Sequence, residues 1–305
     1  EPSLNLVKNA AGRWNFEALL ERGVGRGRRG DPQAYFPYIG IDDGRVNFKF
    51  GDQKSLFHVR EVEAAISPPR DAGGRWWMRL GGQPARTDHV LSGMGRVRAQ
   101  GSLVTGAQPA IQFEVGLEES AMSYLLRLAR GTDYGVHGSL GVRLRLSGEL
   151  SRVRVEGTLE AGDVHRWDIH PGQESRLQAP FRGEWDVPGQ KLALETTGAK
   201  ALRARLRLES YLSRPQWNVT VELAEAPAAP LVRLAQHFGA ALPADLELKG
   251  SLDGRLEFAG SVWPAGAVKL REGRLAVRQA PPIEIAPAEL TLADGAFDLA
   301  PTAVR

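Results

Sequence analysis

The chain has 305 residues, of which 42% are apolar and 25% are charged, and its formal net charge is only +3. This composition excludes a disordered chain and allows one elongated domain or about two compact ones. Because the charges nearly balance, we expect no nucleic-acid partner. The chain has no cysteine, which excludes disulfides, thiolate zinc sites and a cysteine nucleophile.

The two ends of the chain indicate a piece of a longer protein. No stretch approaches the run of about 20 apolar residues that a membrane-spanning helix requires, and the first residues, EPSLNLVKN, lack the apolar core of a signal peptide. Both ends are strand-like, PSLNLV and FDLAPTAVR, and neither has a polar tail. We therefore expect a soluble fragment, with any membrane anchor outside this sequence.

The first predicted elements are a short helix, a linker and a strand. NFEALLER (15–22) has helical spacing, with Asn15 as its N-cap. The segment 22–35, RGVGRGRRGDPQAY, is the one low-complexity stretch and is expected to be a flexible basic linker. RVNFKFG (45–51) alternates apolar and polar residues, which predicts a strand.

The same period-two alternation continues through the rest of the chain. It predicts strands at GVRLRLSG (141–148), SRVRVEG (151–157), ALRARLRLESYL (201–212) and WNVTVEL (217–223). Amphipathic helices are predicted at 121–130 and 230–242. Clusters of Gly and Asp predict turns at 42–44, 146–150, 250–254 and 293–295. Strands that are wetted on one face are typical of antiparallel sheets, so we expect a mainly β protein: an elongated, curled antiparallel sheet, ordered as a meander and similar to a groove or solenoid, with a few short helices.

An internal repeat of about 106 residues is predicted from two matching segments. IQFEVGLEESAMSYLLRLAR (111–130) and WNVTVELAEAPAAPLVRLAQ (217–236) align strand with strand and helix with helix. The same offset pairs Leu140 with Leu246 and Gly148 with Gly254. A supersecondary unit that buries its apolar face by stacking on its neighbour is typical of a solenoid.

The segment AGDVHRWDIHP (161–171) contains two acids and two histidines. As a strand it places Asp163 and His165 on one face, and Asp168 and His170 on the other. Two ligands on a face are too few for a metal ion, which needs three or four. We therefore expect no metal or other cofactor here, and a structural role for the Trp and His side chains.

The sequence contains no convincing catalytic signature. GRGRRG (25–30) matches G-x-G-x-x-G, but neither the strand nor the helix of a dinucleotide site flanks it. The signatures of serine hydrolases, P-loop proteins and zinc proteases are absent from the sequence. Glu118 and Glu119 precede a predicted helix and suit the dipole at its N-terminus. We therefore expect a protein that is not an enzyme.

The strongest candidate site is the apolar face of the predicted sheet. With few helices to cover it, this face either forms an ordinary filled core or lines a groove for apolar ligands. The residues expected to line such a groove share the apolar parity of their strands: Val142, Leu144, Leu146, Val153, Val155, Leu206, Leu208, Val219, Val221 and Leu223.

Several segments resemble the bacterial AsmA family, and the resemblance covers nearly the whole chain. The most specific are PSLNLV with GRWNF near the N-terminus, and GTLEAGDVHRWDI. The others are FPYIGIDDGRVNFKF, LFHVREVEAAISP, WWMRLGGQPARTD, LPADLELKGSL and APPIEIAPAELTL. Members of that family are similar to bridge-like lipid transfer proteins, with an N-terminal membrane helix and a long periplasmic β-rich body around a hydrophobic groove.

The resemblance implies that residues 1–305 form one elongated β-rich periplasmic region, tethered to the inner membrane in the full-length protein. It implies phospholipid or another acyl lipid as the ligand, and a role in lipid transport and outer-membrane maintenance. This sequence departs from the family in lacking the N-terminal helix and in being short for a bridge. Two alternatives stay open: an envelope scaffold with a filled core that binds other envelope proteins, and a carbohydrate-active enzyme with two carboxylates in a cleft.

Overall fold

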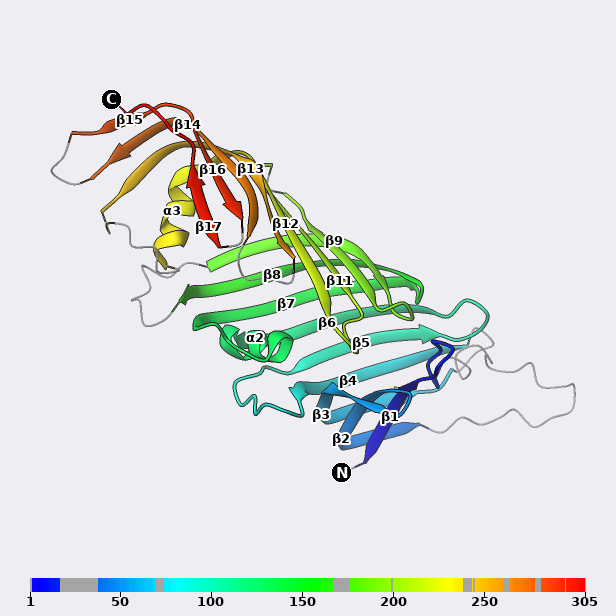
Figure 1. The fold of residues 1–305 in the computed structure, drawn as a ribbon. Helices are drawn as coiled ribbons and strands as arrows, with labels where there is room; N and C mark the ends of the chain where they lie inside the picture. Colours follow the sequence, from blue (N-terminus) through cyan, green and yellow to red (C-terminus); the bar gives the residue numbers. More distant parts are fainter. Residues whose placement is uncertain are drawn as a thin grey trace, which may run out of the picture.

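The part of the chain that the structure describes forms one open sheet of 17 strands with two short helices (Figure 1). The computed structural model describes residues 2–16, 38–69, 74–166, 176–198, 200–237, 243, 245–259, 264–277, 281–293 and 295–304. Its strands are β1 (Ser3–Lys8), β2 (Ile39–Phe50), β3 (Gln53–Ser67), β4 (Arg75–Arg86), β5 (Val97–Val104), β6 (Ala110–Ala121), β7 (Val136–Glu149), β8 (Arg152–Arg166), β9 (Arg176–Asp186), β10 (Lys191–Thr196), β11 (Leu202–Glu209), β12 (Gln216–Pro227), β13 (Glu247–Ala259), β14 (Ala265–Ala276), β15 (Ile283–Ile285), β16 (Ala288–Ala293) and β17 (Ala296–Leu299). Its helices are α2 (Met122–Arg130) and α3 (Ala228–His237). The predicted mainly β fold, with an elongated curled antiparallel sheet, is confirmed.

The strands follow one another as a meander. Each strand from β2 to β14 pairs antiparallel with the next. β14 then pairs with both β15 and β16, and β16 pairs with β17. At the other end β1 pairs with β2 in parallel. Because nearly every pairing joins neighbours in sequence, the register of each strand depends mainly on its own alternation and on a short turn.

Two of the four predicted turns lie inside long strands instead, and there the prediction is wrong. The segments 42–44 and 250–254 belong to β2 and β13. The segment 146–150 covers the end of β7 and reaches the turn to β8 only at Leu150, and Ala293 ends β16 shortly before β17 begins. Asp43 has a φ of 49° at a β-bulge, and Gly250, with a φ of 129°, faces the bulge at Glu272. A bulge bends and twists a strand without ending it, so these residues curve the sheet.

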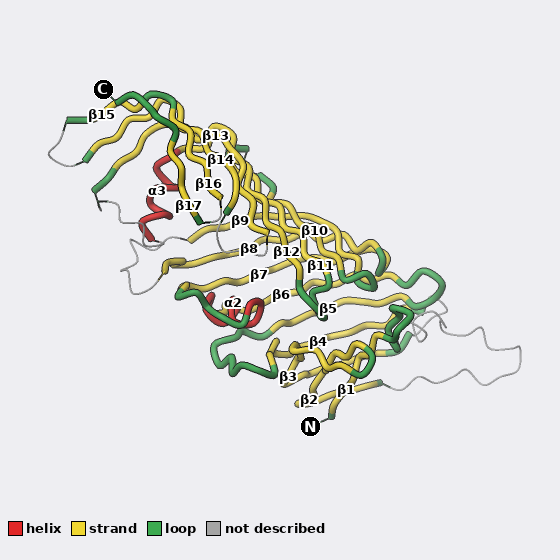
Figure 2. The backbone as a smooth tube through the Cα atoms, in the orientation of Figure 1, coloured by secondary structure: helices red, strands yellow, loops and turns green. Residues whose placement is uncertain are grey.

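The sheet folds back so that β10, β11 and β12 lie across its earlier strands (Figure 2). Three contacts between residues far apart in sequence hold this arrangement. The Ser55 hydroxyl donates to the Leu212 carbonyl at 2.7 Å, and Lys8 Nζ donates to the Pro188 carbonyl at 3.1 Å. The Arg130 guanidinium, at the end of α2, lies 5.0 Å from the centroid of a Trp ring at the start of β12.

The turn between β11 and β12 is fixed by partly buried hydrogen bonds. Trp185 Nε1 donates to the Tyr211 hydroxyl at 2.8 Å, and the Leu212 N–H donates to Gln190 Oε1 at 3.0 Å. The Gln190 residue is 4% exposed, and the bond from Leu212 satisfies its side-chain oxygen within the protein. Together with the Ser55 bond, these contacts attach the tip of the β11–β12 hairpin to both β3 and β9.

The predicted helices agree with the structure where it describes them. α2 matches the helix predicted at 121–130, and α3 begins two residues before the helix predicted at 230–242. Residues 17–22 of the first predicted helix and the whole of the predicted linker 22–35 lie outside the described residues. The Asn15 side chain accepts from Val7 N and donates to the Asn5 carbonyl, so it bonds to β1.

The two segments that match in sequence have the same course in space. β6 and β12 begin and end 106 residues apart, and α2 and α3 begin 106 residues apart. Each strand has a bulge at the same place, after Leu117 and after Leu223. In the next strand the equivalent residues are Leu140 and Leu252, because the connection after the helix is longer. The predicted pairing of Leu140 with Leu246 is therefore wrong, as is that of Gly148 with Gly254.

We expect Gly183→Ala to destabilise the fold-back strongly. An alanine Cβ at this position of β9 would lie 1.9 Å from the Ala193 carbonyl oxygen of β10, so the backbone must shift. The free energy of unfolding in urea should fall by about 2 to 3 kcal/mol. Gly116→Ala is the matched control, because its Cβ would meet only the Val142 oxygen at 3.9 Å. Equal stability of the two variants would contradict the prediction.

We also expect Tyr211 to ionise at a higher pH than an ordinary tyrosine. Burial raises the pKa of Tyr211 from 10.0 to about 12, with Asp186 adding to the shift and the bond from Trp185 opposing it. An unfolded tyrosine ionises near 10, so the folded state binds more protons between the two values. Stability should therefore fall as pH rises from about 10 to about 12. Ultraviolet titration should show the late ionisation, and Tyr211→Phe should remove it; an unchanged late ionisation in that variant would refute the assignment.

Candidate functional site

All ten predicted groove residues lie on the same face of the sheet, the apolar face. One row of cross-strand neighbours runs through eight consecutive strands, β6 to β13, and all of its members are apolar or glycine: Phe113, Leu146, Val155, Gly183, Leu194, Leu206, Val219 and Phe258. This continuity follows from the register, which keeps residues of one parity together from strand to strand.

Four of the ten residues are buried. Val153 and Val155 are 0% and 2% exposed, and with Leu146 and Phe113 they form the centre of a packed cluster. Half-buried apolar side chains from β4, β5, β9 and β10 pack against this cluster. Leu223, in the second copy of the repeat, is also buried. In these places the apolar face is ordinary core.

The other six residues are only half-buried, and we call the surface they line the trough. They are Val142 and Leu144 on β7, Leu206 and Leu208 on β11, and Val219 and Val221 on β12. Apolar side chains in a filled core would be almost completely buried. Water still reaches these six side chains, so packing within the protein leaves part of the trough surface uncovered.

The helix α2 lies at the margin of the apolar face. It contains no buried residue, although its sequence is amphipathic. It begins after Ala121 without a side-chain cap and ends at Gly131 in the left-handed conformation. Glu118 and Glu119 lie in the bulge of β6 and not in the first turn of the helix, so the predicted dipole role is wrong; Glu118 pairs instead with Arg98 at 2.8 Å.

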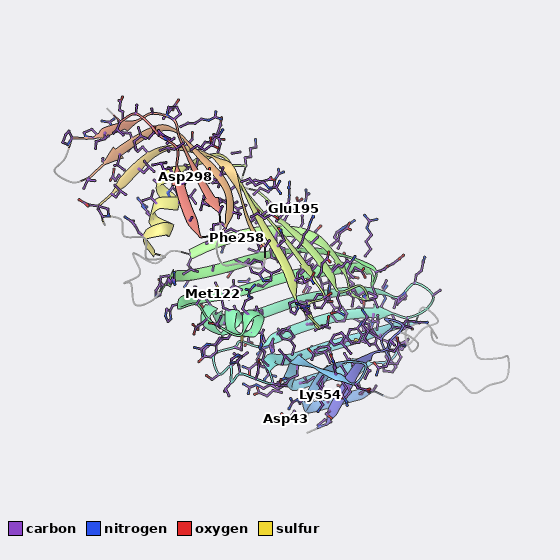
Figure 3. All side chains as sticks on the ribbon, in the orientation of Figure 1. Asp43, Lys54, Met122, Glu195, Phe258 and Asp298 are labelled. Atoms are coloured by element: carbon purple, nitrogen blue, oxygen red, sulfur yellow. The ribbon has the colours of Figure 1, made fainter. Side chains whose placement is uncertain are left out.

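Side chains project from both faces of the sheet (Figure 3). On the face opposite to the apolar one, a row of charged residues alternates in sign from strand to strand. The register aligns, from β6 to β11, Glu114, Arg145, Glu156, Arg182, Glu195 and Arg205. Arg145 lies 3.3 Å from Glu114, and Arg182 lies 2.9 Å from Glu195. Each exposed pair contributes little alone, but like charges would meet if a strand slipped against its neighbour.

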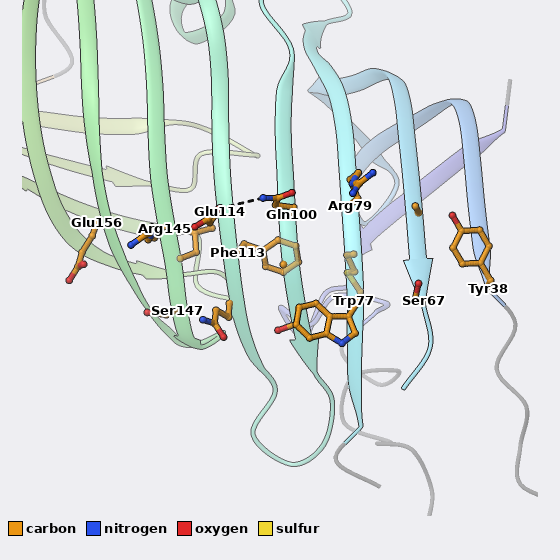
Figure 4. A pocket seen from close by; sticks show the side chains of 16 residues that line it. Tyr38, Ser67, Trp77, Arg79, Gln100, Phe113, Glu114, Arg145, Ser147 and Glu156 are labelled. Carbon is orange, nitrogen blue, oxygen red and sulfur yellow. Dashed lines mark hydrogen bonds and ion pairs between the residues drawn. The ribbon is translucent and has the colours of Figure 1, made fainter. Parts of the chain in front are cut away.

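A hollow of about 730 Å³ opens on this charged face, over β3 to β8 (Figure 4). We call it the polar hollow. The side chains that define it belong to the charged face: Tyr38, Ser67, Trp77, Arg79, Gln100, Gln112, Glu114, Arg145, Ser147 and Glu156. Sequence reasoning missed these residues, because they come from seven segments and only the register assembles them. The one indication of these residues in the sequence is that they occupy the polar positions in the alternation of their strands.

The segment AGDVHRWDIHP departs from the predicted alternation. Asp163 is a bulge residue with a φ of 51°, which places His165 opposite His137 of β7. The two imidazole rings stack with centroids 5.4 Å apart. Residues 167–171, with the other predicted acid and histidine, lie outside the described residues. No group of three or more His, Asp or Glu side chains in the described ranges has a geometry suited to a metal ion.

In the part of the chain that the structure describes, no helix has the length and apolar character needed to span a membrane. Comparison of the sequence with protein-family models and curated proteins, and of the fold with solved structures, finds no match.

Proposed function

We propose that this protein is a non-enzymatic lipid-binding module, which shelters acyl chains in the trough and takes part in lipid transfer. The observation that carries the proposal is the unbroken apolar row from β6 to β13, together with the six half-buried apolar side chains of β7, β11 and β12 that line the trough. A surface of this kind on a water-exposed protein marks a binding site for apolar groups.

The physical chemistry of such a site needs no covalent step. Each methylene group that leaves water for an apolar surface is stabilised by about 0.8 kcal/mol. β7 has 14 residues and β12 has 12, so each is far longer than a single side chain. An acyl chain can therefore lie along these strands. A lipid headgroup would stay in water at the rim of the trough.

The proposed setting rests on the resemblance to the AsmA family. On that resemblance we propose a periplasmic location, tethered to the inner membrane by a segment outside this sequence. The ligand would be phospholipid or another acyl lipid, and the role would be lipid transport in support of the outer membrane. The open sheet and the two-faced strands are compatible with this setting.

We expect the purified protein to bind one acyl chain in its trough. Binding of cis-parinaric acid should raise the emission of this fatty acid, and mass spectrometry should find phospholipid or fatty acid in protein purified without detergent. Val221→Asp places a charge in the half-buried trough, so it should abolish fatty-acid binding while the protein stays folded. The readouts are fluorescence titration and circular dichroism.

Two further variants make the test specific. Val153→Asp puts the same charge at a fully buried core position and should unfold the protein. Ala193→Asp adds the same charge on the exposed, charged face of β10 and should change neither stability nor binding. If folded Val221→Asp still binds the fatty acid, or the unmodified protein binds none, the lipid proposal is wrong and a filled scaffold is favoured.

A further inference from the structure

We propose that the polar hollow binds a neutral, gluco-configured oligosaccharide, on the face of the sheet opposite to the trough. This site is independent of the proposed lipid function. Figure 4 shows its labelled side chains coming from successive strands, with Tyr38 and Trp77 toward one side and Glu156 toward the other.

The first observation is a pair of exposed aromatic side chains at one side of the hollow. Tyr38 is 63% exposed and Trp77 is 57% exposed. Large aromatic side chains that stay exposed beside a cavity favour a ligand with an apolar face and a polar edge. A pyranose ring with equatorial hydroxyls has this form, because its C–H groups lie on both ring faces and its hydroxyls around the edge.

The second observation is the lining beside the aromatic rings. Ser67, Gln112 and Ser147 belong to one row of cross-strand neighbours that also contains Trp77. Hydroxyl and amide groups both donate and accept hydrogen bonds. Sugar hydroxyls also do both, so this row suits a polyhydroxylated ligand better than an apolar one.

The third observation is the balance of charge in the next row. Arg79 and Arg145 are offset by Glu114 and Glu156, so the charged side chains that line the hollow sum to zero. A site for a polyanion would carry an excess of Arg and Lys. The balanced lining therefore favours a neutral ligand.

Two of these four charged groups are free to bind a ligand. Glu114 is engaged by Arg145 at 3.3 Å and by the Gln100 amide at 3.4 Å. The Arg79 guanidinium and the Glu156 carboxylate form no hydrogen bond or ion pair with any residue in the described ranges. They provide one strong donor and one strong acceptor, which can bind hydroxyls of a sugar ring.

The hollow also continues along the sheet. A neighbouring hollow of about 1150 Å³ shares six of its lining residues, which are Ala65, Arg79, Gln100, Glu114, Arg145 and Glu156. The two hollows therefore form one continuous depression over β3 to β8. The second hollow adds Glu63 and three arginines, and each arginine is offset by a glutamate: Arg96 pairs with Glu63, Arg98 with Glu118, and Arg143 with Glu160. A depression of this shape fits several sugar units in a row better than a single monosaccharide.

Isothermal titration calorimetry with maltotriose, cellotriose and chitotriose tests the proposal. We expect saturable, millimolar or tighter binding of at least one trisaccharide. Trp77→Ala should weaken that binding about tenfold through loss of ring stacking, and Tyr38→Ala should weaken it less. Leu177→Ala, at a 63% exposed side chain away from both hollows, should bind as the unmodified protein does.

The outcomes also separate this site from the trough. Val221→Asp should keep its affinity for the trisaccharide, since it changes the opposite face. Circular dichroism should show that Trp77→Ala is folded; if it is not, Tyr38→Ala decides. The proposal is overturned if none of the three trisaccharides binds the unmodified protein saturably, or if the folded aromatic variants bind with unchanged affinity.

Discussion

The structure depends on one constraint, that a single sheet with an apolar face must cover that face with its own strands. Successive residues of a strand point to opposite faces, and the register keeps one parity together across the chain. The sheet therefore folds back, so that β10 to β12 cross earlier strands and Val153 and Val155 become buried. Bulges such as those at Asp43 and Glu272 curve the long strands. Gly183, where no Cβ fits beside Ala193, permits the close approach of β9 and β10.

The same constraint separates two kinds of surface that share each strand. In β7, Leu144 faces the trough and Arg145 faces the polar hollow. Because neighbouring residues of one strand point in opposite directions, a substitution on one face changes the other only through stability. Each surface is built by the register from many strands, so neither needs a local sequence motif. This explains why a search for catalytic or ligand signatures finds none, although both surfaces have clear chemical character.

Much of the fold could be predicted from the alternation alone, because that signal is local. The strand character of WNVTVEL and the helix at 121–130 follow from spacing within about ten residues, and the structure has both. The turns predicted at 42–44 and 250–254 are wrong, because Gly and Asp residues also occur at β-bulges. The polar hollow could not be predicted for a different reason. Its residues share one surface only because β4 to β8 pair in succession, which places Trp77 and Glu156 on the same face of the sheet. Which apolar residues are core and which line the trough depends on the fold-back, as the contrast between Val153 and Val221 shows.

The meander has a consequence for how the molecule assembles. When each strand pairs with its neighbour in sequence, most native contacts close short loops, and such contacts form early and at low entropic cost. The bond between Ser55 and Leu212 is different, because it joins residues 157 apart. Strands β2 to β9 can therefore pair in order as the chain emerges, each on the edge left by its predecessor, before the residues that cover their apolar face have been made. For that interval the long apolar surface is exposed to the surrounding solution, until β10 to β12 have been made and fold across it.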